Sequence, residues 1–184
     1  FLWKMPNIEK VIYLTFDDGP IPEVTEFVLS QLIQYQAKAT FFCIGDNIQK
    51  NPTIFQKIIT NKHSIGNHTF NHLNGCKNTT YIYIENTKKC ETELQKFGIK
   101  NQLFRPPYGK IKPSQATQLI KIGYKIVCWD VLTYDFDNTL NIEKTYPKIL
   151  NSIENGSIIV FHDSLKAEKN LRILLPKLIF DLKK

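Results

Sequence analysis

Arginine is scarce in this sequence. Only Arg105 and Arg172 are present, although 24 lysine and arginine residues stand against 17 acidic ones and the formal charge is +7. The positive charge is therefore almost entirely lysine, scattered along the chain. Nucleic-acid-binding proteins usually gather arginine and lysine on one face, interleaved with aromatic residues. We interpret the charge as a lysine-solvated surface with a mild attraction to anionic polymers, and we expect no nucleic-acid partner.

Long hydrophobic runs, internal repeats and low-complexity stretches are also lacking. No apolar run approaches the ~20 residues that a membrane-spanning helix needs, so we expect no transmembrane segment in this sequence. Because the sequence begins at Phe1 rather than Met, we expect that an N-terminal segment, such as a signal or an anchor, is missing. The 184 residues, 42% of them hydrophobic, predict a single domain spanning 1–184 with a substantial core.

Cysteine pairs of the CxxC type are absent, which argues against a zinc ribbon or a thioredoxin-type site. Cys43 and Cys128 lie inside apolar runs, and we expect both to be buried. Cys76 and Cys90 flank a polar segment and could pair in an oxidising compartment, but we favour unpaired thiols.

Short β-branched or aromatic runs alternate with longer segments of helical periodicity. This alternation predicts an α/β fold with a mainly parallel sheet, either open and doubly wound or closed into a small, imperfect barrel. Strands are predicted at 11–16, 39–44, 64–66, 103–104, 124–129 and 157–161. Helices are predicted near 24–35, 52–61, 81–97, 113–122, 142–154 and 168–183.

Chemically active side chains follow five of the predicted strands. Parallel strands share one carboxyl edge, where α/β proteins build their active sites, so these residues should meet there. A polar residue at one strand end needs no special explanation, but five such ends favour a shared site. The residues are Asp17, Asp18, His68, Arg105, Asp130, Asp135, His162 and Asp163.

The segment "NHTFNH" places His68 and His72 four residues apart. On a helical turn this spacing directs both imidazoles to one side, which suits a metal ion. The pattern alone is weak, because short motifs recur by chance, but the chain has only four histidines. Two histidines and an acid from another strand would form a three-ligand site with an open position for water, as in catalytic zinc sites.

Two further segments carry groups that could assist a reaction. In "FRPPYG", Arg105 precedes two prolines, a pattern equally consistent with a rigid loop and a solvent-facing arginine. In the functional interpretation, Arg105 binds a carboxylate bidentately and the stiff loop aims backbone N–H groups at a reacting oxygen. His162 ends the apolar run "SIIVF". A lone histidine is more often merely a satisfied polar residue, but imidazole titrates near neutral pH and can deliver a proton.

Together, five segments resemble the motifs of polysaccharide deacetylases with NodB homology, carbohydrate esterase family 4. They are "TFDDG" at 15–19, "HTFNH" at 68–72, "RPPYG" at 105–109, "YDF" at 134–136 and "VFH" at 160–162. The first three match closely and are specific in combination. Phe136 stands where the family commonly has tryptophan, Val160 where it has leucine, and Leu132 where many members have an acid. These departures would reshape the pocket for the acetyl methyl and the sugar.

The resemblance implies a distorted or incomplete (β/α)7 barrel and a divalent metal, usually zinc or cobalt. It implies that three residues ligate the metal: Asp18, His68 and His72. Four residues would handle protons: Asp17 as general base, Arg105 as its partner, Asp135 as support for Arg105 or His162, and His162 as general acid. Four residues would form the substrate pocket: Tyr108, through its backbone N–H to the oxyanion, with Pro106, Phe136 and Val160.

The function implied by the resemblance is metal-dependent removal of N-acetyl groups from the amino sugars of a polysaccharide, such as peptidoglycan or a chitin-like glycan. An extracytoplasmic, monomeric enzyme is expected. One alternative is a deacylase or deformylase that acts on a lipid-linked sugar or a small amide. Another is a catalytically silent glycan-binding module. A glycosidase is disfavoured, because its two carboxylates must lie ~5–10 Å apart across the sugar bond, whereas the side chains of adjacent acids diverge.

Overall fold

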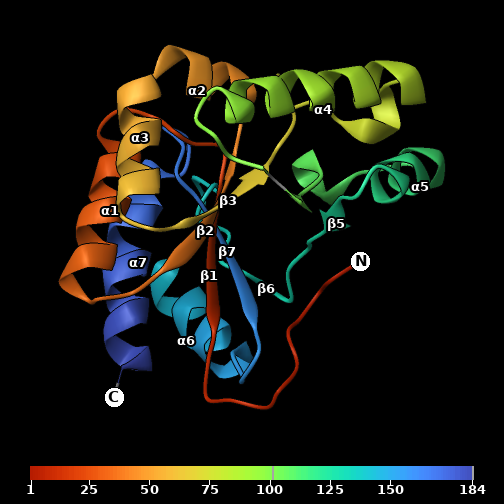
Figure 1. The fold of residues 1–184 in the computed structure, drawn as a ribbon. Coiled ribbons are helices and arrows are strands. Elements are labelled where there is room, and N and C mark those ends of the chain that lie inside the picture. Colours follow the sequence, from red (N-terminus) through yellow and green to blue (C-terminus); the bar gives the residue numbers. More distant parts are fainter. Residues whose placement is uncertain (101, 184) are drawn as a thin grey trace.

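The computed structural model describes residues 1–100 and 102–183; residues 101 and 184, which fall within the predicted domain, lie outside the described part. Parallel strands form one curled sheet in the order β5-β4-β3-β2-β1-β7-β6 (Figure 1). Their bounds are β1 (Tyr13–Asp17), β2 (Ala39–Cys43), β3 (Ser64–Asn67), β4 (Leu103–Phe104), β5 (Lys125–Ile126), β6 (Val131–Leu132) and β7 (Ile158–His162).

The strand order is that of a barrel opened between β5 and β6. Each strand from β1 to β5 lies beside the next in sequence, and β7 pairs with β1 as the last strand of a closed barrel would. The predicted incomplete (β/α)7 barrel with parallel strands is confirmed, and the doubly wound alternative is not adopted. The two-residue β6, which was not predicted, extends the sheet beyond β7.

The N-terminal residues lie across the opening of the barrel. Leu2 forms a bridge with Val127 just after β5, and Lys4 forms one with Ser157 just before β7. The Leu2 N–H donates to the Ile126 carbonyl at 2.8 Å. In Figure 1 the red N-terminal segment accordingly runs from beside β5 to the lower end of the sheet before it turns into β1.

Helices line the outside of the sheet, and α1, α3 and α7 stand together along one side of it (Figure 1). Their bounds are α1 (Val24–Gln34), α2 (Gly45–Lys50), α3 (Pro52–Thr60), α4 (Thr80–Gln95), α5 (Pro113–Lys121), α6 (Ile142–Ser152) and α7 (Glu168–Leu182), with short 3-10 turns η1 (Gly75–Lys77) and η2 (Pro107–Gly109). Six of these helices were predicted; α2 was not. None of the described helices combines the length and apolar character needed to cross a membrane.

The main core lies between the sheet and the helices on its outer face. Phe16 on β1 stacks on Phe41 of β2 at 5.1 Å between ring centroids and on Phe161 of β7 at 5.8 Å. All three rings are completely buried. Because side chains alternate along a strand, this packing turns the next residue of β1, Asp17, to the inner face of the sheet. The core therefore orients the first acid of the site.

All four cysteines are free thiols. Cys43 and Cys128 are buried, as predicted. Cys76 is exposed whereas Cys90 is buried on α4, so the disulfide between them that the sequence left open is not formed.

Candidate active site

Strand register brings the predicted site residues to one edge of the sheet. In the β1–β7 pair, Asp17 lies opposite His162. In the β3–β4 pair, Asn67 lies opposite Phe104, so the next residues, His68 and Arg105, leave neighbouring strands at the same level. The carboxyl ends of parallel strands thus assemble side chains that are far apart in the sequence.

Asp130 does not belong to this edge, contrary to the prediction. It precedes β6 rather than ending β5, and it lies at the opposite end of the sheet. There its carboxylate accepts the Ser157 hydroxyl at 2.8 Å and the Ile158 N–H at 2.6 Å. The prediction was wrong because the apolar run 124–129 looked like one continuous strand, whereas the ladder stops at Ile126 and resumes in β6.

Asp17 is fixed by a buried ion pair. The Arg105 Nη1 donates to Asp17 Oδ1 at 2.8 Å, and both side chains are almost inaccessible to solvent. The same nitrogen also donates to the Thr15 hydroxyl at 2.7 Å. Since removing one partner would leave the other charge buried and unpaired, each holds the other in place.

The expected bidentate contact between Arg105 and a carboxylate is not formed. Its Nε donates to the Val127 carbonyl at 3.2 Å and its Nη2 to the Cys128 carbonyl at 2.8 Å. These carbonyls follow β5 at the opening of the sheet, and each accepts a hydrogen bond from one nitrogen of the guanidinium. The guanidinium also lies over the Phe42 ring, 4.2 Å from its centroid. Arg105 therefore links β1 to the segment that follows β5.

Asp18, His68 and His72 form a group that could hold a metal ion, with ligand atoms within 4.8 Å of one another. Asp18 Oδ1 lies 3.7 Å from His68 Nε2 and 3.3 Å from His72 Nε2. This Oδ1 is buried and accepts no hydrogen bond within the described part of the chain. Because buried carboxylate oxygens are normally satisfied, the orphaned oxygen fits a metal ligand.

The protonation of the two histidines also fits a metal. His68 Nδ1 lies 2.8 Å from the Arg105 carbonyl, which can only accept, so Nδ1 carries the hydrogen. The Nε2 lone pair then faces Asp18, the arrangement in which a second group orients a ligating imidazole. Burial lowers the pKa of His68 to about 3, aided by neighbouring His72. Burial also lowers the pKa of His72. Both rings are therefore neutral and able to ligate.

The two histidines are not on a helical turn, as the spacing had suggested, but on a tight loop after β3. Thr69 and His72 have left-handed φ angles of 63° and 54°. The Asn67 side chain accepts the Thr69 N–H at 2.8 Å, and the Thr69 hydroxyl accepts the Leu73 N–H at 3.0 Å. Such side-chain bonds compete with a helix. The loop nevertheless brings the rings to 5.0 Å between centroids.

Asp135 lies against His162 rather than Arg105. Its carboxylate accepts the His162 backbone N–H and faces His162 Nδ1, both at 2.7 Å. Burial alone would lower the pKa of His162, but the hydrogen bond and charge of Asp135 outweigh it and raise the pKa to about 9. His162 is therefore protonated at neutral pH, as a proton donor requires.

The predicted pocket residues differ in exposure. Tyr108 is 60% exposed, has a left-handed φ of 61°, and its ring lies 4.4 Å from that of His72. Phe136 meets the His162 ring edge-on at 5.1 Å. Val160 is completely buried two residues before His162, on the same face of β7, and Pro106 is also buried. Leu132, which pairs with Val160, is partly buried.

Several residues that hold the site had been given no role from the sequence. Asn86 of α4 accepts the Phe70 N–H at 2.8 Å and so fixes the histidine loop. Asn170 of α7 donates to the Asp135 carbonyl at 3.0 Å. Asp163, whose pKa burial raises to about 8, accepts the Gly19 N–H at 3.0 Å. Only Asp163 had a local signal, because it follows His162 directly.

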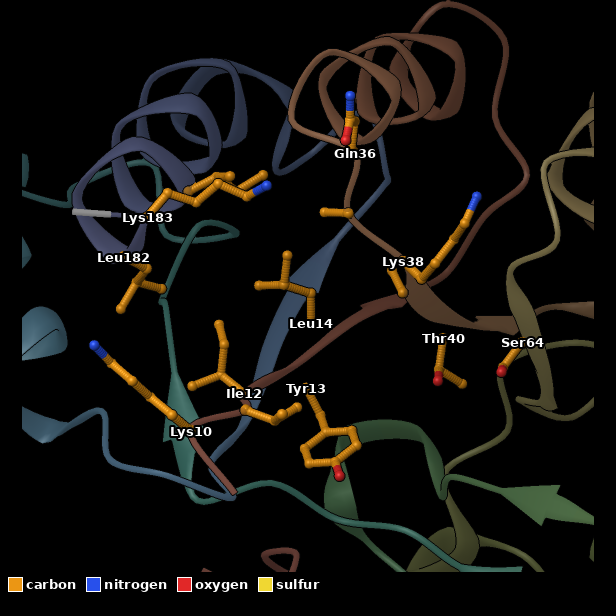
Figure 2. Close-up of a pocket in the computed structure, with 14 residues that line it drawn as sticks. Lys10, Ile12, Tyr13, Leu14, Gln36, Lys38, Thr40, Ser64, Leu182 and Lys183 are labelled. Carbon is orange, nitrogen blue, oxygen red and sulfur yellow. The ribbon is translucent and has the colours of Figure 1, made fainter. Parts of the chain in front are cut away.

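A cavity of about 660 Å³ lies at the other end of the strands, away from this site. Figure 2 shows Lys10, Lys38 and Lys183 around an apolar interior that includes Leu14 and Leu182. Its described lining contains no acid, histidine or cysteine. Large pockets are the usual first hypothesis for an active site, but the described lining of this one has none of the acids and histidines that gather at the strand ends.

Comparisons with known proteins find similar deacetylases. The polysaccharide deacetylase family profile matches residues 4–127. A peptidoglycan-N-acetylglucosamine deacetylase of Bacillus cereus is 34% identical over 191 residues, covering 99% of this chain and 86% of the relative. A chitooligosaccharide deacetylase of Azorhizobium caulinodans is 37% identical over 163 residues, covering 87% and 77%.

The fold comparison extends over the whole sheet. The crystal structure of the Bc1960 peptidoglycan N-acetylglucosamine deacetylase, in complex with an N-oxidanyl-benzamide, superposes with a TM-score of 0.93 at 33% identity. The match covers 99% of this chain and 86% of that chain, and so includes the last two motifs, which lie beyond the family profile. The chain therefore belongs to the polysaccharide deacetylases with NodB homology, carbohydrate esterase family 4.

Proposed function

We propose that this protein is a metal-dependent hydrolase that removes N-acetyl groups from amino sugars of a polysaccharide, with peptidoglycan or a chitin-like glycan as substrate. The observation that carries the proposal is the division of two adjacent acids: Asp17 is held by Arg105, whereas Asp18 turns to two neutral imidazoles. The relatives named as peptidoglycan and chitooligosaccharide deacetylases support this substrate class.

Asp18, His68 and His72 would hold the metal. Two imidazole nitrogens and one carboxylate suit zinc best, with cobalt as an alternative, since both accept this donor set. A divalent ion bound there would polarise the acetamide carbonyl and lower the pKa of water from ~16 toward ~7.

Asp17 is the general base in this mechanism. Arg105 and the register of β1 hold its carboxylate beside the histidines; Asp17 Oδ2 lies 4.0 Å from His68 Nε2. From this position it takes the proton of the attacking water. The Tyr108 backbone N–H is assigned to the oxyanion, a contact whose loss costs roughly 3–4 kcal/mol in other enzymes.

His162 is the general acid that protonates the departing amine. An amide does not cleave readily unless its nitrogen is protonated as it leaves, so the imidazole must carry a proton when it is needed. Asp135 raises the pKa of His162 and so favours the protonated imidazole. Phe136, Val160 and Pro106 are assigned to the pocket beside these groups, where the acetyl methyl and sugar would sit.

The proposal also covers the domain organisation, the location and the oligomeric state of the enzyme. Motifs from Asp17 to His162 converge on one site, which supports a single catalytic domain for 1–184. Relatives named for peptidoglycan support an extracytoplasmic location. A monomer is proposed, because every assigned group comes from one chain.

Acetate release tests the function. Chitooligosaccharides, peptidoglycan and small N-acetyl compounds should be compared with and without a chelator. We expect release from at least one glycan and its loss after metal removal. Asp17→Asn should lower turnover at least 100-fold, within the range for general-base loss, and leave bound metal nearly unchanged. Loss of metal in this variant would mean that the two acids are wrongly assigned.

The same panel separates the alternatives. Acetate or formate release from small amides or lipid-linked sugars alone would favour the small-amide deacylase. Glycan binding by the metal-loaded protein without any acetate release would favour a silent binding module.

A further inference from the structure

The backbone of Asp18 has an unusual conformation. Its φ angle is 86°, in the left-handed region that residues with a side chain seldom adopt. Such strain persists only where the surroundings hold it, and it is often found at functional sites. The chain must therefore contain groups that keep Asp18 in this conformation.

One such group is the carboxylate of Asp163, which is completely buried. Its Oδ1 accepts the Gly19 N–H at 3.0 Å, and its Oδ2 accepts the Thr25 hydroxyl of α1 at 2.6 Å. A Cβ atom at Gly19 would lie 1.9 Å from Asp163 Oδ2. The glycine is therefore required by the close approach of this carboxylate.

The second group approaches the same peptide from the other side. The Asn47 side chain of α2 donates from Nδ2 to the Asp18 carbonyl at 2.7 Å. The Asp18 carbonyl and the Gly19 N–H belong to one peptide unit, because they flank the same C–N bond. This peptide is thus held at its oxygen by Asn47 and at its nitrogen by Asp163. Holding this peptide at both ends fixes the position of the Asp18 carbonyl carbon and with it the φ angle of Asp18. The Cβ atom turns about the same N–Cα bond, so the direction of the side chain is fixed as well.

We propose that Asp163 and Asn47 are positioning residues that hold the Asp18–Gly19 peptide at both ends and thereby aim Asp18 Oδ1 at His68 and His72. The inference rests on the proposed metal site and adds residues to it that touch neither metal nor substrate. Asp163 directly follows His162, and its N–H donates to the Asp17 carbonyl at 3.0 Å. The end of β7 therefore supplies both the general acid and the support of the metal ligand.

The test is Zn²⁺ affinity, measured by competition with a chromophoric chelator on folded protein. Asp163→Asn keeps the shape but exchanges one acceptor oxygen for a donor amide. We expect its Zn²⁺ affinity to fall roughly 10- to 100-fold, as when groups that orient metal ligands are changed in other sites. Asn47→Ala, at a partly exposed position, should lose about 10-fold by the same reasoning.

Asp130→Asn is the matched control. Asp130 also accepts one hydroxyl and one backbone N–H, but at the opposite end of β7. We expect it to lower thermal stability and leave Zn²⁺ affinity unchanged. The proposal is overturned if Asp163→Asn binds Zn²⁺ like the wild type and merely melts earlier, as the control does. If Asp163→Asn does not fold, unchanged affinity in Asn47→Ala overturns it.

Failure of the proposed function gives a different result. A wild type that binds Zn²⁺ but releases no acetate rejects the deacetylase and leaves the affinity comparison intact. A wild type that binds no Zn²⁺ rejects the metal site and with it the positioning role.

Discussion

At the scale of single residues, the charge of His162 depends mainly on Asp135, with smaller contributions from Asp17 and Asp18. Its folded-state pKa of about 9 lies above the ordinary value of 6.5, because Asp135 outweighs the effect of burial. The stabilisation from this pair is therefore complete below about pH 6.5 and is lost as the pH rises through about 9. In the proposed mechanism, the proton that His162 donates is lost over the same upper range.

Asp135→Asn should shift the alkaline limb of the pH–rate profile to lower pH. Without the carboxylate charge of Asp135, the largest influence that raises the pKa of His162 is removed while burial still lowers it, so less imidazolium remains at neutral pH. We expect turnover at pH 7 to fall by about 10²- to 10⁴-fold, with Zn²⁺ affinity unchanged. Profiles of kcat against pH for both proteins measure the shift. An unmoved alkaline limb would show that His162 is not the acid.

At the scale of elements, the sequence predicted the helices and strands whose pattern of apolar residues extends over several residues. The periodicity of 24–35 and the aromatic run of 39–44 are long enough to identify α1 and β2 without knowledge of their neighbours. The six-residue α2 and the two-residue β6 are too short to show a period, and the sequence did not predict them. The shape of the histidine loop could not be predicted from local sequence either, because it depends on Asn86, fourteen residues beyond His72.

Gly66 on β3 gives a test at this scale. It pairs with Phe42, and a Cβ atom there would lie 2.2 Å from Phe42 Cδ1. Because the Phe42 ring lies beneath the Arg105 guanidinium, Gly66→Ala should displace both. We expect a loss of about 1–3 kcal/mol in the free energy of unfolding, the usual cost of overpacking, and a fall in kcat. Urea unfolding and turnover measure the two effects.

Gly98→Ala is the comparison for Gly66→Ala. Gly98 has a positive φ of 72°, and within the described part of the chain a Cβ atom there would meet nothing closer than 4 Å beyond its sequence neighbours. Its replacement should cost about 1 kcal/mol of stability through the backbone alone and leave kcat unchanged. Equal kcat in both variants would contradict a role for the Phe42–Arg105 contact.

At the scale of the whole molecule, the site is assembled from strand ends across the sheet. Because parallel strands share an edge, the sequence predicted most of the residues that gather there, but it wrongly included Asp130 and did not give the partners of the others. Asp135 could have supported Arg105 or His162, and only the folded chain decides. Likewise, no local pattern connects Asn47 to Asp18. Distant partners depend on how helices pack, which local periodicity does not encode.

Metal binding should stabilise the entire fold, because the ligands follow two different strands, β1 and β3. At a Zn²⁺ concentration 100 times the Kd, the gain is about 2.7 kcal/mol, or roughly 5–10 °C in Tm for a chain of this size. Thermal unfolding with and without chelator measures it. His72→Gln should abolish the shift.

His63→Gln is the control for this shift. His63 is buried away from the site, where its Nδ1 accepts the Ala39 N–H at 3.3 Å. The variant should melt at a lower temperature and still respond to Zn²⁺. A wild-type Tm that does not change with metal would contradict the assigned ligands.

The position of β7 has a consequence for how the protein is made. This strand is synthesised after the other six, yet it inserts between β1 and β6. Until then β1 is an open edge with unpaired backbone groups, the kind of surface on which unfinished chains aggregate. The arrival of β7 covers that edge and delivers His162 opposite Asp17 in one step. In the proposed mechanism, a nascent chain that ends before β7 therefore lacks its general acid.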